Sequence, residues 1–243
     1  GHPGTSSCWP FREPGTGTIG KLSTTGLVTV PQRAEKPAAA DVVVAVVAVV
    51  DGADPETGRE RVMRAAYDLF SRQGTRTVGV DAVIGEAGVA KMTLYRNFAS
   101  KDALIIAFLE RREALWTHGW VQTESRRRGD TPVQRLLAIF EIFGEWFARP
   151  DFEGCSFVTT LLEVTDRDSP VRQASIKHLA NIRSYVCELA TQAGVADPDS
   201  FAHQWHILMK GSIVAAAEGD IYAAARAREL GILLLNHHGI ATS

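Results

Sequence analysis

The stretch TVGVDAVIGEAGVAKMTLYRNFASK, residues 77–101, carries the strongest structural signal in this chain. It predicts two short helices that are joined by a tight turn and followed by the start of a third helix. Apolar side chains between residues 80 and 84 give the first helix one apolar face. Gly88 ends that helix, because glycine readily adopts the left-handed conformation that terminates helices. Leu94 and Phe98, four residues apart, share one side of the second helix. This arrangement is typical of a helix-turn-helix.

Side chains on the other side of the second helix are predicted to contact DNA. In a helix-turn-helix this helix enters the major groove, with its early residues near base edges and its flanks on phosphates. We expect residues 91–93 to lie near base edges. Thr77, Tyr95 and Lys101 are expected to hold phosphates, which position the protein without specifying sequence. The expected contacts are Thr77, Lys91, Met92, Thr93, Tyr95, Arg96, Asn97 and Lys101.

The run AGVAKMTLYRNFASKDAL, residues 87–104, resembles the TetR family of bacterial transcriptional regulators, whose pattern here is roughly A-G-V-S-x-G-T-L-Y-x-H-F-x-S-K-x-x-L. Ala90 stands where the family usually has Ser, Met92 where it usually has Gly, and Asn97 where it often has His. These differences bear on base reading, because Ala90 lacks a hydroxyl and Met92 adds bulk. The resemblance implies an all-α protein with an N-terminal three-helix head that holds the helix-turn-helix and a C-terminal helical bundle for ligand binding and dimerisation.

Composition on either side of the motif divides the chain into three parts. Residues 1–56 are rich in glycine and proline near their start and lack hydrophobic periodicity, so we expect a disordered N-terminal extension. We expect a helix-turn-helix DNA-binding domain at 57–103, here called the head, and a helical ligand-binding and dimerisation domain at 104–243, here called the body. Residues 57–112 carry ten basic and six acidic side chains, a balance of +4, whereas 12 basic and 16 acidic side chains beyond them give −4. This asymmetry indicates a DNA-binding module joined to a second function.

Capping signals mark where the helices begin. Thr57 and Glu60 predict a capping box at the start of the first helix. Ser100 predicts the N-cap of a helix of about 27 residues that ends near Arg128 and connects head to body. Further helices are predicted at 132–148, 155–166, 170–193, 198–218 and 221–237, three of them after a capping residue and a proline (Thr131, Ser169 and Asp197).

Aromatic residues are concentrated in the first half of the body. Clefts between bundle helices that are lined with aromatic side chains bind flat or apolar molecules, and the resemblance implies an inducer site here. Plain hydrophobic core is the alternative for each of these side chains. The expected pocket residues are Trp116, Trp120, Phe143, Trp146, Phe147, Phe157, Glu163 and His206.

The last two predicted helices carry more apolar surface than a terminal hairpin needs. Small residues between the large ones allow close helix approach. The resemblance implies that this pair packs against its twin as a four-helix bundle, so we expect a two-fold homodimer. The expected interface residues are Trp205, Met209, Ile213, Ala216, Tyr222, Leu233 and Leu234.

Other chemistry finds little support in the sequence. It has no nucleophile elbow, P-loop, dinucleotide fingerprint or zinc signature, so neither catalysis nor a cofactor is expected. His203 and His206 have a spacing compatible with metal binding, but no third ligand is evident, so no metal site is expected. Cys155 is either a redox-sensitive thiol at a helix start or a small packing residue. Three scattered cysteines and the absence of an apolar run of roughly 18 to 20 residues favour a cytoplasmic protein without a membrane partner.

These features predict a dimeric, ligand-responsive transcriptional regulator and not an enzyme. We expect a repressor that a small apolar or aromatic effector releases from a palindromic operator in double-stranded DNA. Its two heads would occupy successive major grooves, about 34 to 36 Å apart. Two alternatives remain, an all-helical enzyme and a body that binds a partner protein while the head is retained.

Overall fold

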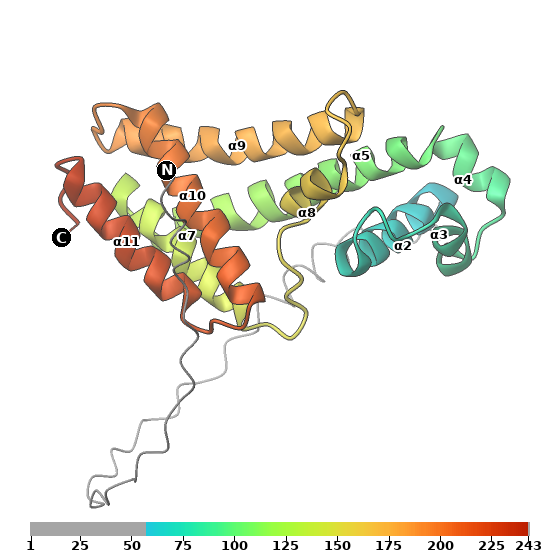
Figure 1. The fold of residues 1–243 in the computed structure, drawn as a ribbon, viewed down its shortest axis with the longest axis horizontal. Coiled ribbons are helices and arrows are strands. Elements are labelled where there is room, and N and C mark those ends of the chain that lie inside the picture. Colours follow the sequence, from blue (N-terminus) through green and yellow to red (C-terminus); the bar gives the residue numbers. More distant parts are fainter. Residues whose placement is uncertain (1–56, 243) are drawn as a thin grey trace, which may run out of the picture. The chain divides into compact units, whose positions relative to one another are not determined.

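The computed structural model describes residues 57–242, and every regular element within that range is a helix (Figure 1). The all-α prediction is therefore confirmed for this part of the chain, whereas the predicted extension at 1–56 lies outside the described residues. The elements are α2 (Gly58–Gln73), α3 (Val80–Ala87), α4 (Lys91–Asn97), α5 (Lys101–Arg112), the π-helical η1 (Glu113–Gln122), α6 (Thr123–Arg128), α7 (Pro132–Phe147), α8 (Ser156–Glu163), α9 (Pro170–Gln192), α10 (Pro198–Ala217) and α11 (Ala223–His237).

Helix α2 packs against α3, α4 and α5 and completes the three-helix head. The Thr57 hydroxyl caps it by accepting a hydrogen bond from the Glu60 amide at 3.2 Å. The second hydrogen bond of the predicted capping box, from the Thr57 amide to the Glu60 side chain, is not formed in the described part of the chain. The Glu60 carboxylate instead makes an ion pair with Arg111 of α5 at 2.8 Å. Phe70 of α2 is 2% exposed and packs edge-on against Phe108 of α5. Apolar packing thus holds α2 to the helix that leaves the head.

The predicted long helix is present as three consecutive segments, α5, η1 and α6, of 12, 10 and 6 residues. Ser100 caps it as expected by accepting from the Ala103 amide at 3.1 Å. The middle segment is a π-helix, which the periodicity of the sequence did not predict. Gly119 suits this wider winding, because a Cβ there would lie only 3.0 Å from the carbonyl oxygen of Ala114. π-Helical turns occur often at functional sites.

The body helices begin where their capping residues predict. Thr131 and Gln134 form a full capping box at α7, and the Asp197 side chain caps α10. Helix α8 ends at Glu163, three residues earlier than expected, where Arg172 of α9 donates to the carbonyls of Leu161 and Val164 at 2.8 Å each. Helix α11 begins two residues later than expected, at Ala223, after a turn in which Asp220 accepts from the Tyr222 amide.

Helices α7, α9, α10 and α11 pack together around a buried aromatic centre. Trp205 of α10 is 0% exposed and lies 5.1 Å from the Phe140 ring of α7, measured between ring centroids. Gly231 lets α11 approach this pair, because a Cβ there would come within 2.8 Å of the Trp205 ring. The two C-terminal helices, α10 and α11, therefore pack directly into the core of the body.

Candidate nucleic-acid interface

The helix-turn-helix has the predicted geometry. Helix α3 ends at Ala87 and is capped by Gly88, whose φ of 60° is in the left-handed region that favours glycine. Leu94 and Phe98 anchor α4 because both are buried, at 0% and 4% exposure. The rest of α4 is thereby held with its other side toward solvent.

The side chains predicted to contact DNA lie mostly on this solvent side. Met92 is 63% exposed and Tyr95 is 41% exposed. Thr93 is half-buried, because it packs at the start of α2, where a Cβ at Gly58 would lie 2.6 Å from the Thr93 Cγ2. Lys101 is also half-buried, while Thr77, Lys91, Arg96 and Asn97 are exposed.

Hydrogen bonds within the protein reduce the number of donors and acceptors that some of these side chains have free for a nucleic acid. The Asn97 amide donates back to the Thr93 carbonyl at 2.7 Å, which leaves one amide hydrogen and the oxygen free. The Lys101 ammonium donates to the Arg76 carbonyl at 3.4 Å and keeps two more hydrogens. Lys91 lies 3.5 Å from Asp81, and both of these side chains are exposed, so water screens the pair.

Two basic side chains outside the predicted set lie close to it. The Arg59 guanidinium sits over the Phe98 ring, 5.2 Å from its centroid, and is thereby placed beside the end of α4. Arg76 is exposed and directly precedes Thr77. The excess of basic residues in the head was the sequence signal for this surface, but only the fold indicates which arginines border α4.

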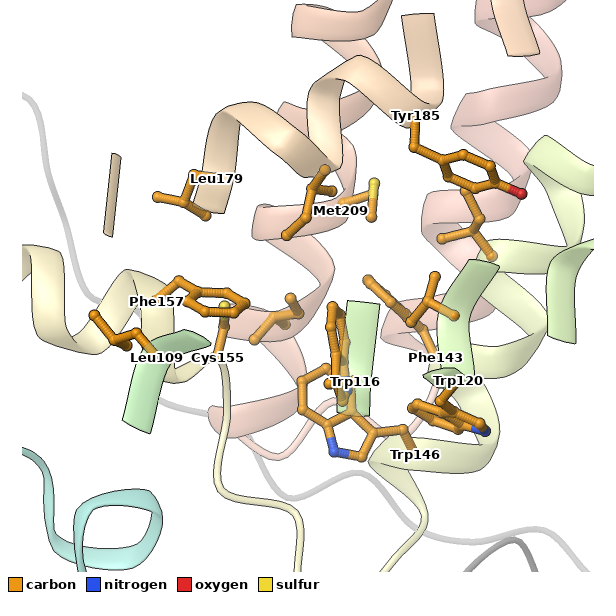
Figure 2. Close-up of a cluster of buried hydrophobic side chains, with 14 of the residues drawn as sticks. Leu109, Trp116, Trp120, Phe143, Trp146, Cys155, Phe157, Leu179, Tyr185 and Met209 are labelled. Atoms are coloured by element: carbon orange, nitrogen blue, oxygen red, sulfur yellow. The ribbon is translucent and has the colours of Figure 1, made fainter. Parts of the chain in front are cut away.

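The aromatic residues predicted to form a pocket gather in one buried cluster (Figure 2). The Trp116 ring lies 5.1 Å from the Trp146 ring, 5.9 Å from Phe143 and 6.3 Å from Trp120. Phe147 is half-buried beside them and lies 5.6 Å from Phe143. The Trp116 indole nitrogen and the hydroxyl of Thr117, both on η1, are buried without a hydrogen-bond partner within the described range. Each leaves a polar group that a ligand atom could satisfy.

Phe157, on α8, belongs to the same cluster (Figure 2). It stacks on His178 of α9, with the ring centroids 5.3 Å apart. The His178 Nδ1 lies 2.7 Å from a Glu113 carboxylate oxygen, and the other oxygen accepts from Asn181 at 2.7 Å. A buried polar group thus adjoins the aromatic cluster at the start of η1.

Two residues of the predicted pocket lie in other surroundings. Glu163 faces the link between α2 and α3, where its carboxylate accepts hydrogen bonds from Thr75 and Arg76. It borders a cavity of about 170 Å³ that is also lined by Phe70, Ser71, Arg72, Gln73, Gly74, Glu153, Ser156, Thr159 and Thr160. His206 is 2% exposed, and burial lowers its pKa from 6.5 to about 3, so it is neutral at physiological pH.

The predicted dimer residues fall into two groups. Trp205, Met209 and Ile213 are buried within the protomer, at 0%, 2% and 7% exposure, so they serve its own core. Ala216 and Leu234 are half-buried. Tyr222 and Leu233 are exposed, as are four other large apolar side chains of this region, Ile207, Val214, Ile221 and Leu230.

The remaining sequence alternatives can be compared with the structure. Burial raises the pKa of the Cys155 thiol and so disfavours the reactive thiolate, which supports a packing role. His203 is exposed while His206 is buried, and residues 57–242 contain no cluster of three or more His, Cys, Asp or Glu suited to a metal ion. No helix in the same range is long and apolar enough to cross a membrane.

Comparison with known proteins links both parts of the chain to one family. The model of bacterial regulatory proteins of the tetR family matches residues 62–108, and the tetracyclin repressor-like C-terminal domain matches residues 132–230. The transcriptional regulator YjdC of Escherichia coli K12 is 23% identical over 178 residues, which cover 70% of this chain and 91% of YjdC.

Solved structures agree with this result. A TetR transcriptional regulator of Streptomyces avermitilis is 28% identical, with a TM-score of 0.69, and the match covers 76% of this chain and 100% of that one. SCO4454, a TetR-family regulator of Streptomyces coelicolor, is 26% identical, with a TM-score of 0.68 and coverages of 74% and 95%. These relatives are transcriptional regulators, not enzymes. The chain belongs to the TetR family and is a DNA-binding transcriptional regulator.

Proposed function

We propose that this regulator is a homodimeric repressor that binds a palindromic operator and leaves it when a small apolar or aromatic effector binds the body. The observation that carries the proposal is the solvent side of α4, where Lys91, Met92, Tyr95 and Arg96 are exposed on a helix that buried Leu94 and Phe98 anchor. Such a helix can enter the major groove with its early side chains near base edges. We keep all eight predicted contacts, from Thr77 to Lys101, as candidates.

The apolar face of α10 and α11 supports the dimer. Ile207 and Val214 lie seven residues apart on α10, and Leu230 and Leu233 lie three apart on α11, so each pair shares one side of its helix. All four are more than half exposed in the protomer. A two-fold partner that presents the same face would bury them. Within the predicted interface we therefore assign the direct contacts to Tyr222 and Leu233 and a supporting role to buried Trp205.

The aromatic cluster supports an effector site in the body. Its members Trp116, Trp120, Phe143, Trp146 and Phe157 are closely packed, so a ligand would have to separate their rings. The indole N–H of Trp116, which has no hydrogen-bond partner among residues 57–242, favours a flat molecule with a hydrogen-bond acceptor. Both Trp116 and Trp120 lie on η1, the π-helical segment that directly follows α5, and α5 in turn begins at the head, so movement of η1 would be transmitted through α5 to the DNA-binding surface.

We also propose the division into a head at 57–103 and a body at 104–243. Helix α5 spans this boundary and packs against α2 on one side and α9 on the other. It is therefore the element through which a change in the body would alter the distance between two heads.

Operator selection from random DNA with the purified protein tests the proposal. We expect enrichment of a palindrome that is bound by one or two dimers, and repression of a reporter that carries it. Aromatic compounds can then be screened for release of that DNA. Binding that stays weak, salt-sensitive and independent of sequence would overturn the operator assignment.

The double variant Tyr95→Phe with Lys101→Ala tests the phosphate contacts. We expect weaker operator binding from both substitutions and a shallower salt dependence from Lys101→Ala, because each lost contact between a basic side chain and a phosphate reduces the magnitude of the slope of log K against log salt by about 0.9. Filter binding or fluorescence anisotropy across a salt series measures both quantities. Lys177→Ala, which removes an exposed lysine from α9, is the matched control and should leave the slope unchanged. Equal slopes for the double variant and the wild type would remove Lys101 from the interface.

A further inference from the structure

One carboxylate of the body holds the link between the first two helices of the head. Glu163 is the last residue of α8, and its Oε2 accepts three hydrogen bonds. The donors are the Thr75 amide at 2.9 Å, the Thr75 hydroxyl at 2.8 Å and the Arg76 amide at 3.0 Å. Hydrogen bonds to an ionised acceptor are about twice as strong as neutral ones, and three donors on one oxygen fix its direction.

The held segment adjoins the DNA-binding surface. Thr75 and Arg76 directly precede Thr77, a predicted phosphate contact. The Arg76 carbonyl accepts from the Lys101 ammonium at 3.4 Å. The backbone at Thr75 and Arg76 is therefore held by Glu163 through its amides and by Lys101 through the Arg76 carbonyl. Thr75 is only 3% exposed, which shields its contact with the carboxylate from water. A displacement of Glu163 would therefore move the segment that leads into Thr77, the predicted phosphate contact.

The surroundings of Glu163 are shaped for this contact. Gly74 has a φ of +78°, and a Cβ there would lie 2.2 Å from the Glu163 Oε1, so a larger residue would push the carboxylate away. On the other side, Arg172 of α9 donates to the Leu161 and Val164 carbonyls at 2.8 Å each and fixes the end of α8. The carboxylate is thus attached firmly to the body and closely fitted to the head.

We infer that Glu163 is a positioning residue for operator binding, which sets the orientation of the head on the body and hence the spacing between the two heads of a dimer. The inference rests on the proposed dimeric operator complex. The side chains of α4 then determine the affinity of one head for a half-site, whereas Glu163 determines the spacing between the two heads. A hydrogen bond is lost when donor and acceptor separate by about 0.5 Å or more beyond 3 Å, so a small movement of α8 would release the head.

The test compares full-length variants on a series of operators whose half-site spacing varies by single base pairs, and on an isolated half-site. For Glu163→Ala we expect about tenfold weaker binding at the best wild-type spacing, a flatter dependence on spacing and half-site affinity within about twofold of wild type. Thr75→Val removes only the hydroxyl donor and should give a smaller change in the same direction. Glu163→Gln keeps an acceptor oxygen and should restore most of the wild-type spacing preference.

Two further variants and one independent readout complete the test. Gly74→Ala should change the spacing preference in the same direction as Glu163→Ala, because it displaces the carboxylate and strains the backbone at a positive φ, whereas Glu141→Ala, which breaks an exposed ion pair with Arg228 inside the body, is the matched control and should change nothing. Hydrogen exchange of the Thr75 and Arg76 amides in the DNA-free protein should accelerate in Glu163→Ala and stay slow in the control.

The outcomes separate this inference from the proposed function. Unchanged exchange and unchanged spacing preference in Glu163→Ala would overturn the inference, and so would an equal loss of affinity on half-sites and at every spacing. A wild-type protein that prefers no paired half-sites would defeat the dimeric operator instead. In that case the exchange rates of Thr75 and Arg76 still decide whether Glu163 holds the head.

Discussion

His206 lies on α10 with 2% of its surface exposed, and its Nδ1 has no hydrogen-bond partner among the residues that the structure describes. Burial is the main cause of its low pKa, and the positive charges of Lys210 and Arg183 act in the same direction. The neutral imidazole is therefore the form compatible with the folded body. In the unfolded chain the same side chain would titrate near its ordinary pKa of 6.5.

This difference predicts a loss of stability in acid. Between pH 6.5 and about 3 the unfolded chain binds a proton at His206 that the folded chain does not, so the free energy of unfolding falls as pH falls through this window. From pH 7 to 5 the contribution of His206 is up to about 2 kcal/mol. Urea unfolding at both pH values should show a smaller decrease for His206→Gln than for the wild type. His203→Gln, at an exposed position on the same helix, should behave like the wild type, and identical decreases in all three proteins would contradict the assignment.

At the scale of single elements, helix starts that look alike in sequence differ in structure. Thr131 and Ser169 each precede a proline at the first position of a helix. The Thr131 hydroxyl accepts from the Gln134 amide at 3.2 Å, while the Gln134 side chain accepts from the Thr131 amide at 3.1 Å. Ser169 makes no side-chain cap, although its backbone carbonyl accepts from the Gln173 amide. The sequence pattern locates both starts but does not distinguish their energies.

The two caps should therefore respond differently to removal of the hydroxyl. Thr131→Ala is expected to lower the free energy of unfolding by about 1 kcal/mol, because it leaves the Gln134 amide of α7 without its acceptor. Ser169→Ala should stay within about 0.5 kcal/mol of the wild type, since no cap is lost. Chemical denaturation of the two variants side by side measures the difference. Equal effects would mean that the hydroxyl of Thr131 does not stabilise α7.

At the scale of the whole molecule, the apolar face of α10 and α11 is the feature of the protomer that favours association with a second copy. Ile207, Val214, Leu230 and Leu233 are between 51% and 64% exposed. Their neighbours Trp205 and Leu235 are fully buried, so the bundle beneath this face is complete without them. Apolar side chains grouped on such a surface gain free energy when a second copy covers them.

Charges on this face should separate the protomers. Val214→Glu with Leu233→Glu is expected to convert a dimer into a folded monomer in sedimentation velocity runs, with unchanged far-UV circular dichroism. Leu162→Glu is the matched control, because Leu162 is 74% exposed on α8 and should tolerate the charge without loss of the dimer. A dimer that survives the double substitution, or one that dissociates with Leu162→Glu, would place the interface elsewhere.

Local pattern was sufficient to predict the helices and the motif. The caps at Ser100, Thr131 and Asp197, the left-handed Gly88 and the buried pair Leu94 and Phe98 depend on residues within a few positions of one another, so their geometry follows from the order of side chains. Helix type and approximate bounds were predictable for the same reason. The resemblance carried by residues 87–104 identified the family because those positions serve one local structure.

Contacts between distant residues could not be read in this way. The π-helical winding of η1, the burial of Trp205 within its own protomer and the place of Glu163 opposite Thr75 all depend on which elements meet in space. Glu163 and Thr75 are 88 positions apart, and nothing in the pattern around either residue refers to the other. Periodicity describes one helix at a time, whereas packing decides which of its faces is covered and by what. The local order of side chains thus determines the helices and the DNA-binding motif, whereas the contact between head and body forms only when distant segments pack together in the folded chain.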